Sequence, residues 1–393
     1  MDLFPPEQIA RLRAPLERSW TLPPAAYTEP AVFREEAARI FRREWLCVAR
    51  VDQLPNPGDY RCVELLDQRI VLTRDRHGRI HALSRICLHR AMPLVEGCGN
   101  ATRLVCPYHN WTYELDGRLR SAPMMDGVDG FEPGACRLPA LRTEIWEGFV
   151  FVNLDPECRP LVPRLTGLQA RIGNYRFADL AVAATTEFDS PWNWKILVEN
   201  FMEAYHHIGP HRESLQRLYP ARDSFVEDNK GAPWALLRMP GRHEPGPQAL
   251  RPLPGLTPEQ QRELIAGCIF PTFLFAASGT LAVWYELLPA AHDRMTLRIH
   301  LLLPREIVPH LDDHARAALT ESTRAIHLED IPANTGPWRG LHAPLTTQGR
   351  LSRYEKAIWQ LNQLWAERML DPPDSGGWKN DPAGGTTSRE TFF

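Results

Sequence analysis

The sequence of 393 residues lacks a long uninterrupted hydrophobic run and lacks an excess of either charge. Its most apolar window, 268–291, is broken by proline, glycine and glutamate, so we expect two buried strands around a turn and no membrane span. A net charge of −3 gives no basic footprint, and we expect no nucleic-acid partner. Residues 1–20 carry no apolar stretch after their charges, which predicts no secretory signal and a cytoplasmic location.

Cysteine is sparse, and nucleotide-binding motifs are missing. The chain has 8 cysteines without a pairing rhythm, so a disulfide framework is excluded and we expect reduced, mostly buried thiols. There is no G-x-G-x-x-G and no P-loop, so the chain shows no fingerprint for a nicotinamide or flavin of its own. The length suffices for about two domains, each with its own core.

The most informative residues are two short cysteine–histidine pairs. They are Cys87-Leu88-His89 and Cys106-Pro107-Tyr108-His109, with 16 residues between them. Each pair offers one thiolate and one imidazole. A Rieske-type [2Fe–2S] cluster needs two cysteines on one iron and two histidines on the other. The spacing therefore predicts that Cys87, His89, Cys106 and His109 hold such a cluster at the tips of two loops.

Zinc is the competing metal, because it also binds two cysteines and two histidines. Zinc sites usually pair like with like, as C-x-x-C followed by H-x(3–5)-H, whereas each pair in this chain is mixed. The surroundings favour a cluster with inorganic sulfides. Such a cluster needs close approach of the backbone and a cover over its sulfides, and the nearby small or rigid residues and the indole suit both needs. These residues are Gly97, Gly99, Pro107 and Trp111. Structural zinc remains the alternative.

The pattern along the chain predicts an α+β protein in four parts. An N-terminal segment, 1–45, ends in an amphipathic helix over 30–45 and is expected to pack on the mixed domain over 156–370. A small all-β domain, 46–155, carries both metal-binding pairs. A mixed domain covers 156–370, and a tail rich in glycine and proline, 371–393, is expected to be flexible.

Within the mixed domain the periodicity predicts alternating helices and strands. Alternation of apolar and polar residues over 294–303 describes a sheet with one face covered. The expected helices are 165–177, 193–208, 258–266, 310–326 and 351–370. The expected strands are 181–189, 233–239, 268–276, 280–288 and 294–303.

A second concentration of ligands lies between Glu203 and His211. Glu203 and His206 are three residues apart and would share one face of a helix. The Gly209-Pro210 pair ends that helix, so His206 and His211 can turn toward one ion. Two histidines with a carboxylate form the facial triad of non-haem Fe(II) oxygenases, which leaves positions open for O₂. We expect the adjacent His207 to point elsewhere, as a hydrogen-bonding or pocket histidine.

The third iron ligand must come from distant sequence. Asp312 and Asp313 stand beside Arg316 in a polar stretch, which is typical of a solvated surface helix. Asp330 follows a segment with apolar helical spacing that should pack against the sheet. We therefore select Asp330.

These residues together resemble the catalytic α subunit of Rieske non-haem iron ring-hydroxylating oxygenases. The resemblance implies a Rieske domain joined to a helix-grip catalytic domain with a curved antiparallel sheet. It also implies iron held by His206, His211 and Asp330, and a homotrimer in which one subunit's cluster serves the next subunit's iron. The matching segments are the region of Trp45, Cys87 to Arg90, Cys106 to Trp111, Asn193-Trp194-Lys195, 203–211, Glu329-Asp330 and 349–352.

The resemblance gives Glu203 the position of the carboxylate that bridges a cluster histidine and an iron histidine between subunits. Such a carboxylate accepts from both imidazoles and fixes their tautomers. We expect its partners to be His109 and His206. Glutamate at this position resembles the branch that includes monooxygenases of choline, betaine and carnitine type, whereas aspartate is usual in the large dioxygenase group. Two further departures are Asn110, where glycine is common, and Trp338, where glutamine is frequent.

The implied function is that of a terminal oxygenase in a multicomponent system. A separate NAD(P)H-dependent flavin/iron–sulfur reductase would supply electrons, and O₂ would hydroxylate or N-demethylate a small organic substrate. A quaternary amine is the first expectation, because an aromatic box can hold it by cation–π attraction. The box residues would come from Trp284-Tyr285, Trp234, Trp192 and Trp338.

Three alternatives stay open. An aromatic acid could be the substrate, with its carboxylate on Arg238 or Arg242. The chain could instead be a Rieske electron-transfer or sensor protein without oxygenase activity, or a zinc-stabilised binder of hydrophobic ligands. The sequence leaves undecided mono- versus dioxygenation, the identity of the reductase and the presence of a β subunit.

Overall fold

The structure is a computed structural model that describes residues 4–242 and 251–371. Most of the predicted flexible tail, 371–393, lies outside the described residues. The helices are α1 (Pro6–Leu12), α2 (Ala25–Thr28), α3 (Pro30–Glu36), α4 (Thr166–Ile172), α5 (Trp194–Phe201), α6 (Leu215–Leu218), α7 (Asp313–Leu341) and α8 (Lys356–Leu370). In these ranges no helix has both the length and the apolar character that crossing a membrane requires.

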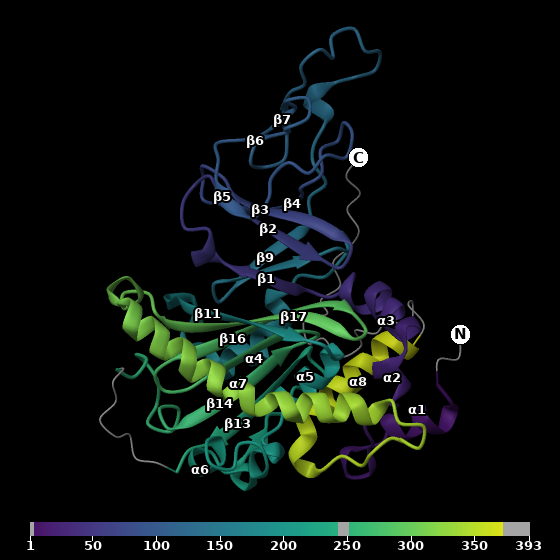
Figure 1. Cartoon of the computed structure of the whole chain (residues 1–393), viewed down its shortest axis with the longest axis vertical. Coiled ribbons are helices and arrows are strands. Elements are labelled where there is room, and N and C mark those ends of the chain that lie inside the picture. Colours follow the sequence, from purple (N-terminus) through teal and green to yellow (C-terminus); the bar gives the residue numbers. More distant parts are fainter. Residues whose placement is uncertain (1–3, 243–250, 372–393) are drawn as a thin grey trace.

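The upper part of Figure 1 consists of small antiparallel sheets that carry the two cysteine–histidine loops. One sheet has the order β4-β3-β2-β5 and a second has the order β6-β7-β8, while β1-β10-β9 lies beneath them. The strands are β1 (Leu46–Arg50), β2 (Asp59–Leu65), β3 (Gln68–Arg74), β4 (Ile80–Ser84), β5 (Cys98–Asn100), β6 (Leu104–Val105), β7 (Thr112–Tyr113), β8 (Leu119–Ser121), β9 (Arg142–Trp146) and β10 (Phe149–Asn153).

The lower part is built on a seven-stranded sheet of order β11-β17-β16-β15-β14-β13-β12, antiparallel throughout. The long helix α7 lies across this sheet in Figure 1 and contacts β11 and β17, while α8 contacts β13. This α+β arrangement confirms the predicted fold class. The strands are β11 (Leu180–Ser190), β12 (Phe225–Val226), β13 (Trp234–Pro240), β14 (Glu263–Ile269), β15 (Phe273–Ala277), β16 (Ala282–Ala291) and β17 (Arg294–Pro304).

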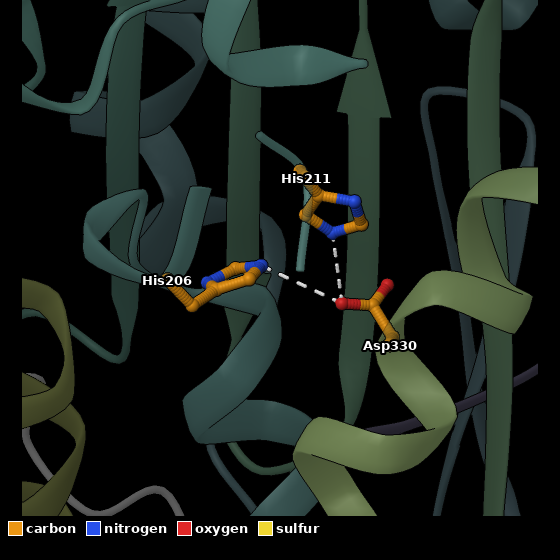
Figure 2. Close-up of side chains that lie close together, drawn as sticks. All are labelled: His206, His211 and Asp330. Carbon is orange, nitrogen blue, oxygen red and sulfur yellow. Dashed lines mark hydrogen bonds and ion pairs between the residues drawn. The ribbon is translucent and has the colours of Figure 1, made fainter. Parts of the chain in front are cut away.

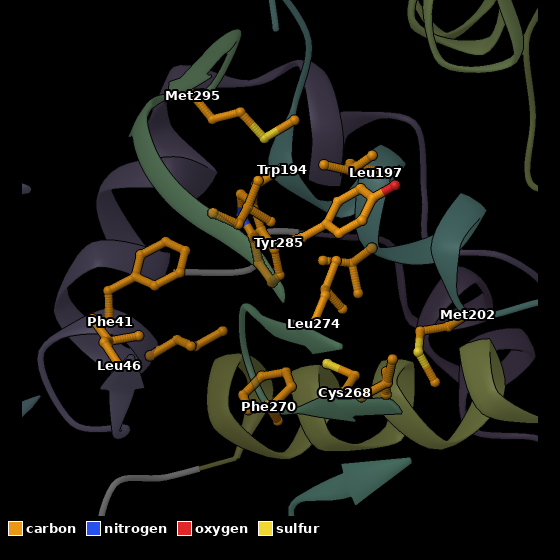
Figure 3. Close-up of a cluster of buried hydrophobic side chains, with 14 of the residues drawn as sticks. Phe41, Leu46, Trp194, Leu197, Met202, Cys268, Phe270, Leu274, Tyr285 and Met295 are labelled. Carbon is orange, nitrogen blue, oxygen red and sulfur yellow. The ribbon is translucent and has the colours of Figure 1, made fainter. Parts of the chain in front are cut away.

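One large hydrophobic cluster joins the N-terminal helices, α5 and the sheet (Figure 3). Trp194 of α5 packs edge-on against Phe41, with ring centroids 5.3 Å apart. Tyr285 of β16 packs against Phe201 at the end of α5, at 4.7 Å. Burial of large side chains like these contributes roughly 1.5–3 kcal/mol each. The cluster fixes α5, and thereby the polar residues that follow it, against the sheet.

The predicted helix over 258–266 is wrong. Residues 263–269 form β14 instead, and all seven of its residues are wholly or largely buried between β13 and β15. The helix-forming residues Glu259 to Glu263 lie at the approach to this strand, and pairing within the sheet outweighs their local preference. The expected strand 268–276 is likewise two strands, β14 and β15, separated at 270–272.

Three of the predicted helices have different extents. The segment 193–208 is not continuous, because α5 ends at Phe201 and a separate single turn covers Tyr205–Ile208. The segment 310–326 is part of the longer α7, which continues through Pro332 and Pro337 to Leu341. Asp330 therefore lies inside a helix and not after one. The predicted helix 30–45 is shorter, as α3 followed by a wide turn over Ala37–Phe41.

The cysteines are free, as the sequence predicts, but fewer of them are buried than expected. All eight cysteines lie in the described residues, and all are free. Burial is less complete than expected, because Cys98 is exposed and three others are half-buried. The division of the chain into four parts stays a prediction.

Candidate metal centres

The two cysteine–histidine loops share one backbone conformation. In the first, the Ala91 amide donates to the Cys87 carbonyl at 3.2 Å, and Ala91 has φ of +54°. In the second, the Asn110 amide donates to the Cys106 carbonyl at 3.0 Å, and Asn110 has φ of +56°. Asparagine is one of the few residues that tolerate this left-handed region. Asn110 therefore fits the turn at the position where the resemblance leads one to expect glycine.

The loops separate thiols from imidazoles. Cys87 and Cys106 are buried, whereas His89 is exposed and His109 half-buried. The two imidazole rings lie with centroids 4.6 Å apart, and Trp111 stacks on His89 at 4.9 Å. A [2Fe–2S] cluster here would have its cysteine-bound iron inward and its histidine-bound iron at the surface.

The arrangement of donors argues against a single zinc ion. Zinc in a tetrahedral site has its donors about 2.0–2.3 Å away, so any two donors lie within about 4 Å of each other. In the described residues, the one group of at least three such side chains whose ligand atoms lie within 4.8 Å of one another is His206, His211 and Asp330. The four loop residues do not form a group of this kind, as is expected of residues that bind two irons and not one ion.

That compact triad is the second candidate centre (Figure 2). His206 lies on the turn after α5, and His211 follows a bend at Gly209. Asp330 projects from α7, so the triad joins two regions far apart in sequence. The Nε2 atoms of His206 and His211 lie 3.5 and 2.9 Å from Asp330 Oδ1. One ion can be bound by all three side chains.

Each histidine has a second carboxylate on its other nitrogen. His206 Nδ1 lies 2.7 Å from Glu203 Oε1, and His211 Nδ1 lies 2.6 Å from Glu329 Oε2. Histidines that ligate metals commonly donate their remaining N–H in this way, which fixes the tautomer and directs Nε2 to the metal. The donor set and its outer partners therefore fit a mononuclear iron.

The electrostatics match a cation site. Burial opposes the charged form of His206, but hydrogen bonds to Asp330 and Glu203 raise its pKa to about 9. His211 has a raised pKa for the same kind of reason, with Asp330 and Glu329 as partners. Although burial works against its carboxylate, the two histidines hold the pKa of Asp330 well below its usual range. Both pKa shifts favour the positively charged form of the ring, as is expected where carboxylates are arranged around a cation.

The chain between α5 and the triad is irregular for identifiable reasons. Asn193 caps the start of α5 by accepting from the Lys195 amide. After Phe201 the helix ends, and Glu203 Oε2 accepts from the backbone amide of His206 at 2.9 Å. Glu203 thus holds both the backbone and the ring of His206. Its predicted bridging role stays a prediction.

A cavity of about 210 Å³ opens beside the triad. Its walls are mostly apolar, with Phe201 and Tyr285 as aromatic surfaces. His207 also lines it and lies 3.2 Å from the Tyr219 carbonyl through Nδ1, as expected of a pocket histidine. The remaining lining residues are Asn200, Glu203, His206, His211, Leu215, Met239, Leu264, Ala266, Ala276, Leu281, Val283, Leu301, Ser322, Thr323, Ile326 and Asp330.

Two sequence predictions about the substrate pocket are wrong. Of the proposed aromatic box, Tyr285 alone lines the cavity, whereas the indoles of Trp192, Trp234 and Trp284 are buried in the core and Trp338 lies on α7 outside the lining. The proposed carboxylate partners also face elsewhere: Arg238 pairs with Glu263 at 2.5 Å, and Arg242 pairs with Asp223 at 2.6 Å.

The sequence prediction missed functional neighbours of the triad. Asn200 donates to Asp330 Oδ1 at 2.8 Å and would orient that carboxylate. Glu329 was noted only as part of a matching segment, yet it contacts His211. Neither residue carries a spacing signal, because one contact joins α5 to α7 and the other joins α7 to a loop. Asp312 and Asp313 are not near the triad; Asp312 caps α7 by accepting from the Ala315 amide.

We expect Glu329→Gln to lower the affinity for ferrous iron by about 10–100-fold, because it removes the anionic partner of His211. Metal titration of the apoprotein followed by iron analysis measures this effect. Glu321→Gln is the matched control, since Glu321 lies on the same helix but is exposed. Equal iron affinity in the two variants would contradict the role given to Glu329.

Comparison with known proteins places these sites in a family. The model "Rieske [2Fe-2S] domain" matches residues 44–132, and "Ring hydroxylating alpha subunit (catalytic domain)" matches residues 177–371. The carnitine monooxygenase oxygenase subunit of Escherichia coli (strain K12) is 36% identical over 197 residues, covering 49% of this chain and 52% of that protein. The glycine betaine monooxygenase oxygenase subunit of Chromohalobacter salexigens is 36% identical over 241 residues, covering 57% and 54%.

A solved structure extends the similarity over nearly the whole chain. The structure of a quaternary ammonium Rieske monooxygenase is 26% identical, with a TM-score of 0.79 over 93% of this chain and 99% of that one. By contrast, the matched segments span about half the length of the two sequence relatives. The two matching domains imply a [2Fe–2S] cluster and a mononuclear iron, and the residues described above fit both. The chain belongs to the family of Rieske non-haem iron oxygenase α subunits.

Proposed function

We propose that this chain is the terminal oxygenase component of a multicomponent Rieske oxygenase that acts on a small amine. The observation that carries the proposal is the compact triad of His206, His211 and Asp330 beside a mostly apolar cavity. When bound, the cluster supplies single electrons and the ferrous iron supplies O₂ chemistry. The protein's part is to ligate both, to exclude water and to place the reactive carbon.

In this proposal Cys87, His89, Cys106 and His109 bind the cluster, and Glu203 links the two centres between subunits. The assembly would be a homotrimer. Its support is the exposure of apolar side chains on both faces that would meet: Leu88 and Tyr108 on the cluster loops, and Tyr205 and Ile208 beside Glu203. Isolated exposed apolar residues are common. Here, however, one apolar pair lies on the loops proposed to bind the cluster and the other lies beside the proposed bridging carboxylate, which favours contact between these two surfaces of neighbouring subunits.

The electron donor would be a separate NAD(P)H-dependent reductase, since the sequence has no nucleotide-binding fingerprint. The printed names of the relatives, which are oxygenase subunits, support a partner of this kind. We place the protein in the cytoplasm, because its eight free cysteines suit a reducing compartment.

For the substrate, we propose a quaternary or tertiary amine without a carboxylate, such as choline. Burying a carboxylate in an apolar cavity costs free energy unless a cation pairs with it. Among the described residues, the cavity lining contains no lysine or arginine. The faces of Phe201 and Tyr285 can attract an ammonium group, with about 0.5–2 kcal/mol each.

A substrate panel tests both parts of this proposal. Choline, glycine betaine, carnitine and benzoate are compared as substrates of the holoprotein with a surrogate reductase. We expect choline to give product-coupled O₂ uptake, with at least about tenfold tighter binding than the carboxylates, equivalent to about 1.4 kcal/mol. Preferred turnover of carnitine or benzoate would contradict the substrate assignment but leave the oxygenase assignment intact.

Iron analysis separates the oxygenase from an electron carrier. Three irons per chain are expected from a [2Fe–2S] cluster plus the triad. Two irons with a reducible cluster, and no O₂-dependent product with any member of the panel, would favour the electron-transfer alternative.

A further inference from the structure

A second cavity, of about 480 Å³, shares Glu203 and His206 of the metal site with the lining of the substrate cavity. Both residues line the two cavities, so the bridging carboxylate forms part of the wall between them. The second cavity is polar in part, because Tyr27, Glu199 and Glu355 also line it. A space of this size with several polar partners can hold ordered waters.

Glu199 is the notable group on this wall. It lies on α5, and both of its carboxylate oxygens are within hydrogen-bond distance of the Tyr27 hydroxyl, at 2.8 and 2.9 Å. In the described residues, Glu199 is the one acid with both of these properties: its two carboxylate oxygens contact one phenol, and it lines a cavity that also reaches Glu203. The metal-binding roles described above do not use Glu199.

The charges around Glu199 come from four elements. Tyr27 faces it from α2, and Lys195 lies on the same helix, α5. Lys195 is itself bound by Glu36 of α3, with Nζ 2.6 Å from Oε1. Glu355, which precedes α8, adds a further negative charge. The segment of α7 that lines the cavity contributes Ala333, Pro337, Gly340 and Leu341, none of which is charged.

The surroundings of Glu199 shift its pKa toward neutral pH. Burial dominates and raises the pKa of Glu199 to about 7, although the hydrogen bond from Tyr27 and the charge of Lys195 act in the opposite direction. The ammonium group of Lys195 is shared with Glu36, which limits its effect on Glu199. A carboxyl group with a pKa near the working pH is suited to both giving and taking a proton.

Monooxygenation of the proposed amine substrate consumes protons. One substrate C–H bond, one O₂, two electrons and two protons become one C–O–H group and one water. The electrons come from the reductase, and the two protons must enter from solvent in every turnover. Resting on the proposed function, we propose that Glu199, held by Tyr27 on the wall of the second cavity, supplies protons to the metal centre during turnover.

The step is a proton transfer with no change of redox state. Protonated Glu199 gives its proton to a water in the cavity, and that water passes a proton toward the wall formed by Glu203 and His206. The transferred proton leaves as part of the product water. The Glu199 carboxylate then takes up a new proton from solvent through the same cavity. The lining of this cavity includes the exposed Gly340, which gives solvent a route to Glu199. Glu199 is thus a relay that does not touch the substrate.

The experiment uses Glu199→Gln in the full holoprotein. Glutamine has nearly the same shape and can still accept from Tyr27, but it cannot release a proton. Infrared difference spectroscopy follows the carboxylic C=O stretch as pH is raised. The wild type is expected to lose one buried carboxylic band with a midpoint near 7, and Glu199→Gln is expected to lack this band. A wild type without that titration would overturn the proposal.

Kinetics supply the second readout. Reoxidation of the dithionite-reduced holoprotein by O₂ consumes electrons and protons whatever the substrate is. We expect it to be at least about tenfold slower in Glu199→Gln, at the low end of the effects of removing an acid–base group, with a larger solvent deuterium isotope effect. An unchanged rate and isotope effect would overturn the proposal, even if Glu199 titrates.

Two further variants separate a relay from a structural role. Tyr27→Phe keeps the carboxyl group but removes a hydrogen bond that favours its charged form, so the titration midpoint and the pH profile should both move upward. Glu35→Gln, on α3 away from the cavity, is the matched control and should change neither. Failure of every amine to give product would count against the proposed function alone, because the reoxidation and infrared comparisons would still decide the role of Glu199.

Discussion

Glu203→Gln, loaded with excess ferrous iron to offset the lost anionic partner of His206, is expected to hold both metals and yet lose about 100-fold or more in product formed per unit time. In the structure, one Glu203 oxygen accepts from the His206 ring and the other accepts from the His206 backbone amide. Glutamine has one acceptor oxygen and one donor NH₂, so it must lose at least one of these contacts. Loss of a positioning group at a reacting centre commonly has an effect of this size.

The measurement combines iron and sulfide analysis, the EPR signal of the reduced cluster, and product per O₂ consumed. Three irons per chain with a normal cluster signal and low product would support a bridging carboxylate. Glu213→Gln, an exposed acid of the same segment that pairs with Arg217, is the matched control and should retain full activity. Full activity in Glu203→Gln would refute the bridge.

His327→Leu is expected to make the protein less sensitive to acid. His327 is buried on α7 against Phe188, with ring centroids 4.3 Å apart, and neither ring nitrogen has a hydrogen-bond partner in the described residues. Burial lowers its pKa to about 4. The unfolded chain takes up a proton near pH 6.5, whereas the folded chain does not, so stability is lost as pH falls from about 6.5 toward 4.

The size of the effect follows from this difference. Between pH 7.5 and pH 5, the folded wild type should lose about 2 kcal/mol through His327 alone. For a domain of about 200 residues this corresponds to roughly 4–8 °C in melting temperature. The melting temperature of His327→Leu should therefore fall by that much less than that of the wild type over the same pH range.

His314→Leu serves as the control, because His314 lies on the same helix but is exposed. Iron content is determined at each pH, so that metal loss is not mistaken for proton uptake by His327. If the wild type and His327→Leu lose the same melting temperature on acidification, His327 is not the buried base described here.

Sequence reasoning is most informative where chemistry is tied to short spacing. The pairs at Cys87 and Cys106, and the run from Glu203 to His211, are local, so residue type and separation alone indicate which atoms can meet. Asp330 was chosen by the apolar spacing before it, and the structure does bring it to both histidines. Its place inside α7 was missed, because two prolines normally signal the end of a helix.

The failures lie where tertiary packing decides. Residues 258–266 have good local helix formers, but β14 is set by its neighbours on both sides. The tryptophans assigned to a substrate box fill the core, since a large apolar side chain gives no sign in the sequence of which cavity it faces. Contacts such as Asn200 with Asp330 join distant elements and have no periodicity to reveal them.

The carboxylates around the triad have a consequence for loading. Three acids, Glu203, Asp330 and Glu329, surround two imidazoles. When both rings are protonated the local charge is −1, and it is again −1 when Fe²⁺ replaces the two protons. Iron uptake by the folded chain thus exchanges two protons for one Fe²⁺ at constant net charge. The electrostatic potential at neighbouring residues therefore changes little. Acidification reverses the exchange and releases the iron.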